Sequence, residues 1–125
     1  MIRPANDYDL NRVHELSRPV AAPKVDYAKW SAPLLVLEID GVVQGYCHAL
    51  VGDPYAVITE LVVAPEIHGK GWGAQLLDAM ELTLRLAGCK AWVGFMAQDN
   101  PVLGGLGRRA TVTGPGVGFV KELTR

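Results

Sequence analysis

The pattern of apolar and polar positions in the first half of the chain predicts one helix followed by a meander of strands. Asn6-Asp7 offers an N-cap, and Leu10, Val13 and Leu16 then fall on one helical face. Residues 34–39 and 42–51 form two strand-like runs joined by Asp40-Gly41, and an Asp-Gly pair between such runs is a strong hairpin signal. A turn then leads into a third strand-like run over 55–63.

The second half of the chain contains the clearest helix. Its apolar residues recur at three- and four-residue spacing, and Gly88 supplies the stop; they are Leu76, Leu77, Met80, Leu84 and Ala87. The order of strands and helices along the whole chain predicts an α/β protein with a mixed sheet and helices on both faces. The weaker elements are a short strand at Ile2-Arg3, an irregular or short-helical segment over 18–32, a strand over 90–96, a short helix over 100–109, and terminal strands over 110–113 and 117–123.

Composition places the chain among single globular domains. Its 125 residues, half of them hydrophobic and a fifth charged, are enough for one core, so we expect a single domain over 1–125. The net charge of −1 leaves no basic stripe of the kind that binds nucleic acid. No apolar run has the form of a signal peptide or the length of a membrane span. Cys47 and Cys89 are too few for a disulfide framework and lack metal-ligand spacing, so we expect a cytoplasmic protein without a metal or a membrane partner.

One segment carries a pattern that points to chemistry. A strand ends near Val63, and the long helix begins directly behind His68-Gly69-Lys70-Gly71-Trp72-Gly73-Ala74. A helix start presents unpaired backbone N–H groups and the positive end of the helix dipole, so it suits an anion. Glycines let the backbone approach a phosphate without an intervening Cβ, and Lys70 adds a positive charge. A tight turn with a helix-packing glycine is the simpler alternative, but three alternating glycines with a lysine favour a phosphate site.

Two familiar phosphate-binding classes do not fit this loop. A P-loop requires Ser or Thr after Gly-Lys, and Gly71 stands there. Gly69-x-Gly71-x-x-Ala74 satisfies the dinucleotide fingerprint, but in that fold the first strand runs almost directly into the glycines. Here residues 64–68 intervene, and too little chain follows for a doubly wound sheet.

The segment instead resembles motif A of the GNAT superfamily of N-acetyltransferases. In that motif, Arg/Gln-x-x-Gly-x-Gly/Ala follows a strand that ends in small apolar residues and often Pro. The stretch from His68 to Gly73, preceded by Leu61-Val62-Val63-Ala64-Pro65-Glu66, is similar to it. Met1 to Ala5 looks like the usual opening of the family, and Asp99-Asn100-Pro101 matches its common Asn-Pro. The resemblance implies a mostly antiparallel central sheet of about six to seven strands.

The resemblance also implies acetyl-coenzyme A as the co-substrate. Its pyrophosphate is expected on backbone N–H groups of the glycine loop, and its pantetheine arm is expected to pair with residues 61–63 like an added strand. The residues so implied in binding are Leu61, Val62, Val63, His68, Gly69, Lys70, Gly71, Trp72, Gly73, Ala74 and Asn100.

The chain departs from the family pattern at two positions. His68 stands where Arg or Gln is usual, which makes that phosphate contact weaker or pH-dependent. The tyrosine that commonly protonates the leaving thiolate aligns with Gly107, so the usual acid is missing. All four tyrosines precede the glycine loop, and Tyr46 or Tyr55 is the one to suspect if an earlier strand supplies the acid.

Transfer to an amine needs a base, because an alkylamine is mostly protonated at neutral pH. Glu60 is the best candidate, at the strand end whose next residues should line the acyl group. His48, on the adjacent strand, is the alternative base. No Gly-x-Ser-x-Gly is present, and Cys47 and His48 are sequence neighbours that a strand directs to opposite faces, so direct transfer is expected.

The resulting hypothesis is an N-acetyltransferase that moves an acetyl group from acetyl-coenzyme A to a primary amine. The acceptor is either a small molecule or an amine of a protein or peptide, and we also allow for a homodimer. Two other classes stay open. The first is a catalytically silent module that binds coenzyme A, which the missing tyrosine favours. The second is a protein-interaction domain on the same fold.

Overall fold

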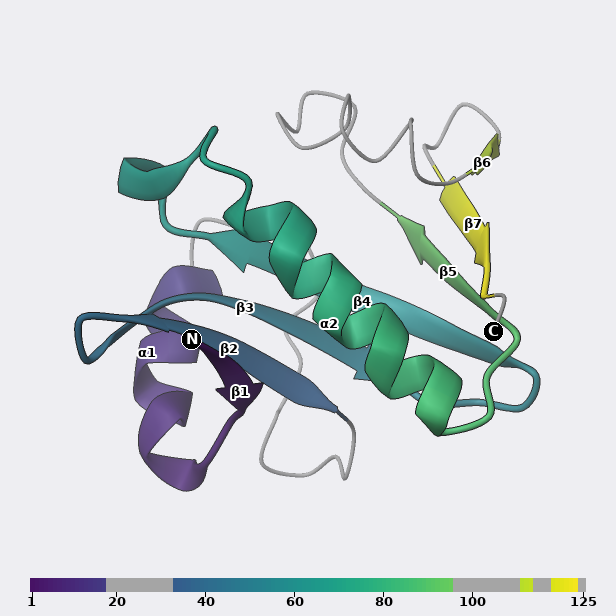
Figure 1. Ribbon diagram of the computed structural model, residues 1–125, viewed down its shortest axis with the longest axis horizontal. Coiled ribbons are helices and arrows are strands. Elements are labelled where there is room, and N and C mark those ends of the chain that lie inside the picture. Colours follow the sequence, from purple (N-terminus) through teal and green to yellow (C-terminus); the bar gives the residue numbers. More distant parts are fainter. Residues whose placement is uncertain (18–32, 96–110, 114–117, 124–125) are drawn as a thin grey trace.

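The computed structural model describes residues 1–17, 33–95, 111–113 and 118–123 of the chain (Figure 1). These residues form one sheet with the strand order β1-β2-β3-β4-β5-β7-β6. Every neighbouring pair is antiparallel except β4 and β5, so the predicted mixed, mostly antiparallel α/β architecture is confirmed. The elements are β1 Ile2–Pro4, the 3-10 helix η1 Asp7–Asp9, α1 Leu10–Ser17, β2 Leu34–Ile39, β3 Val42–Leu50, β4 Tyr55–Val63, the 3-10 helix η2 Pro65–Ile67, α2 Trp72–Leu86, β5 Ala91–Phe95, β6 Thr111–Thr113 and β7 Gly118–Glu122.

The predicted hairpin and helix stop are both present. Asp40 and Gly41 have φ values of 52° and 79°, the two positive values that a tight two-residue turn between β2 and β3 requires. At the end of α2, Gly88 has a φ of 91°, and its N–H bonds to Arg85 O while Cys89 N–H bonds to Leu84 O. These two bonds satisfy carbonyls that the helix leaves without partners.

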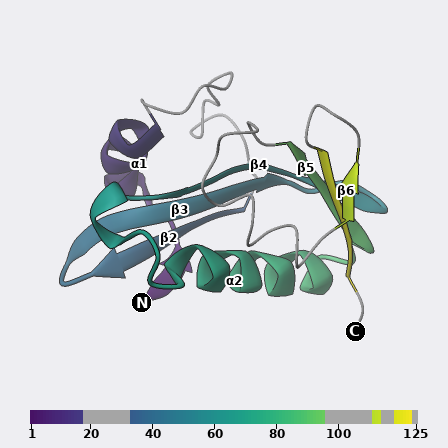
Figure 2. The same ribbon diagram turned by 90° about the horizontal axis from the view of Figure 1, so that it is seen from above.

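The two long helices cover opposite faces of the sheet (Figure 2). On the α2 face, Leu76, Leu77, Met80 and Leu84 pack against apolar residues of β2, β3 and β4, as their helical spacing predicts. On the α1 face a smaller cluster combines Val13 and Leu16 with Val36, Val43, Tyr46 and Ala64. Both cysteines are buried and free, and burial raises the pKa of the Cys47 thiol.

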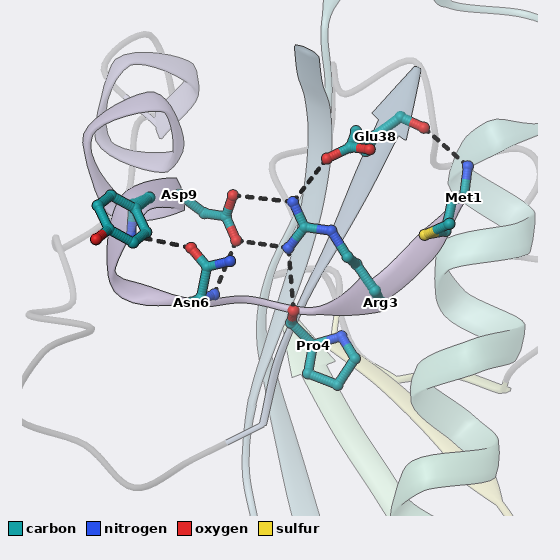
Figure 3. Close-up of polar contacts among 7 residues, drawn as sticks. Met1, Arg3, Pro4, Asn6, Asp9 and Glu38 are labelled. Atoms are coloured by element: carbon teal, nitrogen blue, oxygen red, sulfur yellow. Dashed lines mark hydrogen bonds and ion pairs between the residues drawn. The ribbon is translucent and has the colours of Figure 1, made fainter. Parts of the chain in front are cut away.

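Polar contacts fix the start of the chain (Figure 3). The Arg3 guanidinium lies 2.7 Å from Asp9 and 2.8 Å from Glu38, so one side chain joins β1, η1 and β2. Asn6 accepts a hydrogen bond from Tyr8 N–H, and Asn6 N–H donates to the Asp9 carboxylate, which forms a capping box. The Arg3 guanidinium lowers the pKa of Asp9. In the described ranges, no helix is both long and apolar enough to cross a membrane.

Candidate functional site

The sheet opens at its centre, between β4 and β5 (Figure 1). These two strands pair in parallel only where Tyr55–Ile58 lies beside Ala91–Gly94. Beyond that point β4 continues to Val63 with β3 as its paired neighbour. The last residues of β4 therefore leave one strand edge without a paired strand in the described part of the sheet, and such an edge can pair with an extended ligand.

A β-bulge at this opening sets the direction of Glu60. His48 of β3 pairs with Glu60, but the next residue, Ala49, pairs with Ile58, so Thr59 is an extra residue in β4. Ala56 and Ile58 belong to the cluster on the α2 face. Strict alternation would put Glu60 on that face as well. The extra residue moves Glu60 and Val62 to the α1 face instead.

The Glu60 side chain is buried, with 6% of the residue exposed, and its two oxygens differ. The Tyr46 hydroxyl donates a hydrogen bond to Oε2. Oε1 is buried and makes no hydrogen bond within the described structure. Tyr46 is itself fully buried and pairs with Val62, so it reaches Glu60 diagonally across β3 and β4.

His48, the alternative base, is held by the residue that forms the bulge. The Thr59 hydroxyl donates to His48 O at 3.1 Å, so its oxygen accepts from His48 Nδ1. Nδ1 therefore carries a proton, and Nε2 is buried. Burial lowers the pKa of His48, and the nearby Glu60 carboxylate opposes that shift. The ring is accordingly neutral near pH 7, and a proton on the shielded Nε2 would be disfavoured.

The glycine loop leads from η2 into α2 with an open backbone. Gly69 and Gly71 have φ values of 78° and 85°, and a Cβ built on either would meet nothing within 4 Å. Gly71 is the N-cap of α2, and no side chain caps this helix start. The first helical bond runs from Gln75 N–H to Gly71 O at 3.1 Å, and the N–H groups of Trp72 and Gly73 precede it. This cradle has the donors and the room that an anion requires.

The glycine loop also contacts the end of β4. The His68 ring donates from Nε2 to Val63 O at 2.6 Å, a contact that nothing in the sequence indicates. At the start of α2, a Cβ built on Gly73 would lie 3.7 Å from Val63 Cγ2. The open strand edge and the helix start are therefore neighbours, and Lys70 is exposed beside them.

The structure brings most of the predicted residues to this region. Leu61 and Val63 pack toward the α2 face, whereas Val62 packs toward the α1 face. Tyr55 is exposed at the opposite end of β4, away from the glycine loop. Asn100 and Gly107 lie outside the described residues.

Three features of the site were not predicted from the sequence, namely the bulge at Thr59, the contact between Tyr46 and Glu60, and the contact between His68 and Val63. A signal for the bulge existed, because a charged residue at position 60 interrupts the apolar series of Ala56 and Ile58. No group of His, Cys, Asp and Glu side chains in the described segments is arranged to hold a metal ion.

Comparison with known proteins agrees with this architecture. A sequence model of the acetyltransferase (GNAT) family matches residues 6–104. No curated protein sequence matches the chain significantly.

Several solved structures share the fold at low sequence identity. N-acetylglutamate synthase from Neisseria gonorrhoeae, in complex with coenzyme A and N-acetyl-glutamate, superposes with a TM-score of 0.85 at 18% identity, covering 100% of this chain and 35% of that one. The ribosomal-protein-S18-alanine N-acetyltransferase from Escherichia coli gives a TM-score of 0.81 at 16% identity, with coverage of 100% and 94%. The PaiA N-acetyltransferase from Thermoplasma acidophilum, in complex with coenzyme A, gives 0.78 at 15% identity, with 98% of each chain covered. The chain thus spans about a third of the synthase and nearly all of the other two.

Proposed function

The chain belongs to the acetyltransferase (GNAT) family, and from this premise we propose that it transfers an acetyl group from acetyl-coenzyme A directly to a primary amine. The observation that carries the proposal is the position of Glu60. It is a buried carboxylate on β4, near the start of the open strand edge that ends beside the glycine loop.

The residues around the glycine loop fit coenzyme A. Gly69 and Gly71 leave space for a phosphate, and the first N–H groups of α2, at Trp72 and Gly73, are suited to donate to it. Lys70 adds positive charge at the same place. The backbone of Leu61–Val63 offers the strand edge along which an amide-containing arm would pair. When bound there, acetyl-coenzyme A supplies an acetyl group activated as a thioester.

The proposed role of Glu60 is that of general base. Its Oε1 would take a proton from the acceptor ammonium, either directly or through one water, and the amine nitrogen would then carry a free lone pair. His48 is a poorer base, because its Nδ1 is bound to Thr59 and burial lowers its pKa. Tyr55 lies at the wrong end of β4 to protonate the leaving sulfur, and Tyr46 is bound to Glu60. We assign that protonation to water.

The acceptor is proposed to be an amino acid or a protein terminus. The first class corresponds to the N-acetyl-glutamate in the synthase complex, and the second to the alanine of ribosomal protein S18 named for the Escherichia coli enzyme. Glu60 lies on the α1 face of the sheet, so we place the acceptor there, opposite α2.

The proposal is tested by measuring thiol release from acetyl-coenzyme A with a panel of amino acids, polyamines and peptides with free N-termini. Calorimetry with coenzyme A is run in parallel. Acceptor-dependent thiol release, with the acetylated product identified by mass spectrometry, is expected. Binding without release for any acceptor would favour the silent coenzyme A-binding module, and absence of binding would favour the protein-interaction domain.

A further inference from the structure

The two oxygens of the Glu60 carboxylate have different surroundings, and the difference needs an explanation. Oε2 accepts a hydrogen bond from the Tyr46 hydroxyl, whereas Oε1 is buried without a hydrogen-bond partner in the described residues. A buried carboxyl oxygen without a partner is costly, so such atoms are rare in native proteins outside functional sites. The arrangement leaves one oxygen hydrogen-bonded and the other without a hydrogen-bond partner in the described residues.

The ring that occupies Oε2 is held in place from several sides. Tyr46 is fully buried in the cluster that Val13 and Leu16 of α1 form with Val36 and Val43 of the sheet. Its backbone pairs with Val62 in the β3–β4 ladder, and both neighbouring residues of Tyr46 are also paired with β4. The hydroxyl is therefore a donor in a fixed position, whereas a glutamate side chain by itself has three rotatable bonds.

We propose that Tyr46 is a positioning residue for the acetyl transfer: its hydroxyl holds Oε2 of Glu60 so that Oε1 faces the acceptor amine. This inference rests on the proposed function. It differs from the role of acid that the sequence suggested for Tyr46, because the hydroxyl donates to the base and not to the leaving sulfur. Removing a hydrogen-bond donor from a carboxylate disfavours its ionised form, so the pH dependence of turnover is a readout for this contact.

Few titratable groups face Glu60 in the described part of the chain. Tyr46 and His48 face it from β3, and the Glu60 carboxylate in turn affects His48. The buried residues that α1 contributes are Val13, Leu16 and Ser17, none of which carries a charge near neutral pH, whereas Arg12 of this helix is half-buried and His14 and Glu15 are exposed. A change in the pH profile on removal of the Tyr46 hydroxyl can therefore be assigned to Glu60, with His48 as the group to check.

The test compares turnover and its pH dependence in four variants, Tyr46→Phe, Glu60→Gln, the double variant, and Tyr55→Phe as the matched control. Tyr46→Phe should lower kcat by about 10- to 100-fold, the effect typical of one hydrogen bond to a charged group, with coenzyme A affinity unchanged. The acid limb of the profile should move to higher pH. Tyr55→Phe removes an exposed hydroxyl at the far end of β4 and should behave as the parent. In the Glu60→Gln background, the Tyr46 change should have little further effect.

Two results would overturn the positioning role. One is parent-like turnover and pH dependence in Tyr46→Phe. The other is an equal fall of kcat in the presence and absence of the Glu60 carboxylate, which would indicate a general effect on the fold. If the parent itself consumed no thioester with any amine, the proposed function would fail first, and the inference with it.

A second variant keeps the test open if Tyr46→Phe does not fold. Incorporation of 3-fluorotyrosine at position 46 retains the hydroxyl and nearly the same volume, but the phenol is more acidic and donates more strongly. The acid limb should then move to lower pH, opposite to the shift expected for phenylalanine. An unchanged profile would refute the proposal.

Discussion

Replacing Gly73 with valine should abolish coenzyme A binding while leaving the fold intact. The φ of Gly73 is not positive, and a Cβ built there comes no closer than 3.7 Å to Val63 Cγ2, so a side chain has room in the protein. The valine side chain would, however, fill the space between the first turn of α2 and the end of β4, where we place the phosphate. Valine at Gly71 would test the same idea less cleanly, because its φ of 85° strains any β-branched residue.

The expected loss follows from the hydrogen bonds that the ligand would forfeit. The N–H groups of Trp72 and Gly73 precede the first helical bond of α2, so both are suited to donate to a phosphate. A hydrogen bond to a charged group is worth roughly 1.5–3 kcal/mol. Losing two would cost about 3–6 kcal/mol, which corresponds to a rise in Kd of at least about 100-fold.

The measurement is calorimetric titration with coenzyme A, together with thermal unfolding. Gln75→Val is the matched control, because it adds the same side chain to the exposed surface of α2 beyond the proposed cradle. We expect the control to bind as the parent does, and both variants to unfold near the parent's Tm. A Gly73→Val protein that bound with the parent's Kd would mean that the cofactor does not approach this helix start.

Three further predictions concern catalysis and stability. Glu60→Gln should lower kcat by roughly 10²–10⁴-fold without changing coenzyme A affinity, and unchanged kcat in steady-state assays would transfer the role of base to His48 or to water. Gly88→Ala should lower the free energy of unfolding by about 1 kcal/mol, measured by denaturant titration, because its φ of 91° disfavours a Cβ; equal stability would contradict the strain argument. Asp9→Asn should destabilise the protein at pH 7, because Arg3 lowers the pKa of Asp9 and the stability from that shift is present above the ordinary pKa. That stability is lost as pH falls through the lowered pKa, so the difference from the parent should shrink in acid, and a difference independent of pH would refute the ion-pair origin.

Local sequence patterns determined the secondary structure and the position of the proposed phosphate cradle. The apolar spacing of α2, the Asp40-Gly41 turn and the stop at Gly88 each depend on residues within a few positions of one another, and each is present in the structure. The glycines before α2 are also a local signal, because a helix start and its backbone N–H donors depend only on neighbouring residues. Asn100 lies outside the described residues, so its role remains a prediction.

Only the tertiary structure decided what surrounds the proposed base. Which face Glu60 occupies depends on the pairing of β4 with β3, since one extra residue at Thr59 reverses the alternation beyond it. The partner of Glu60 is Tyr46, fourteen positions earlier in the chain, and the hydrogen bond exists because the two strands pair in one register. The His68–Val63 contact likewise forms across the turn between β4 and the glycine loop. Periodicity indicates the face of an uninterrupted strand, but the residue that each position pairs with also depends on turn geometry and on how both faces of the sheet pack.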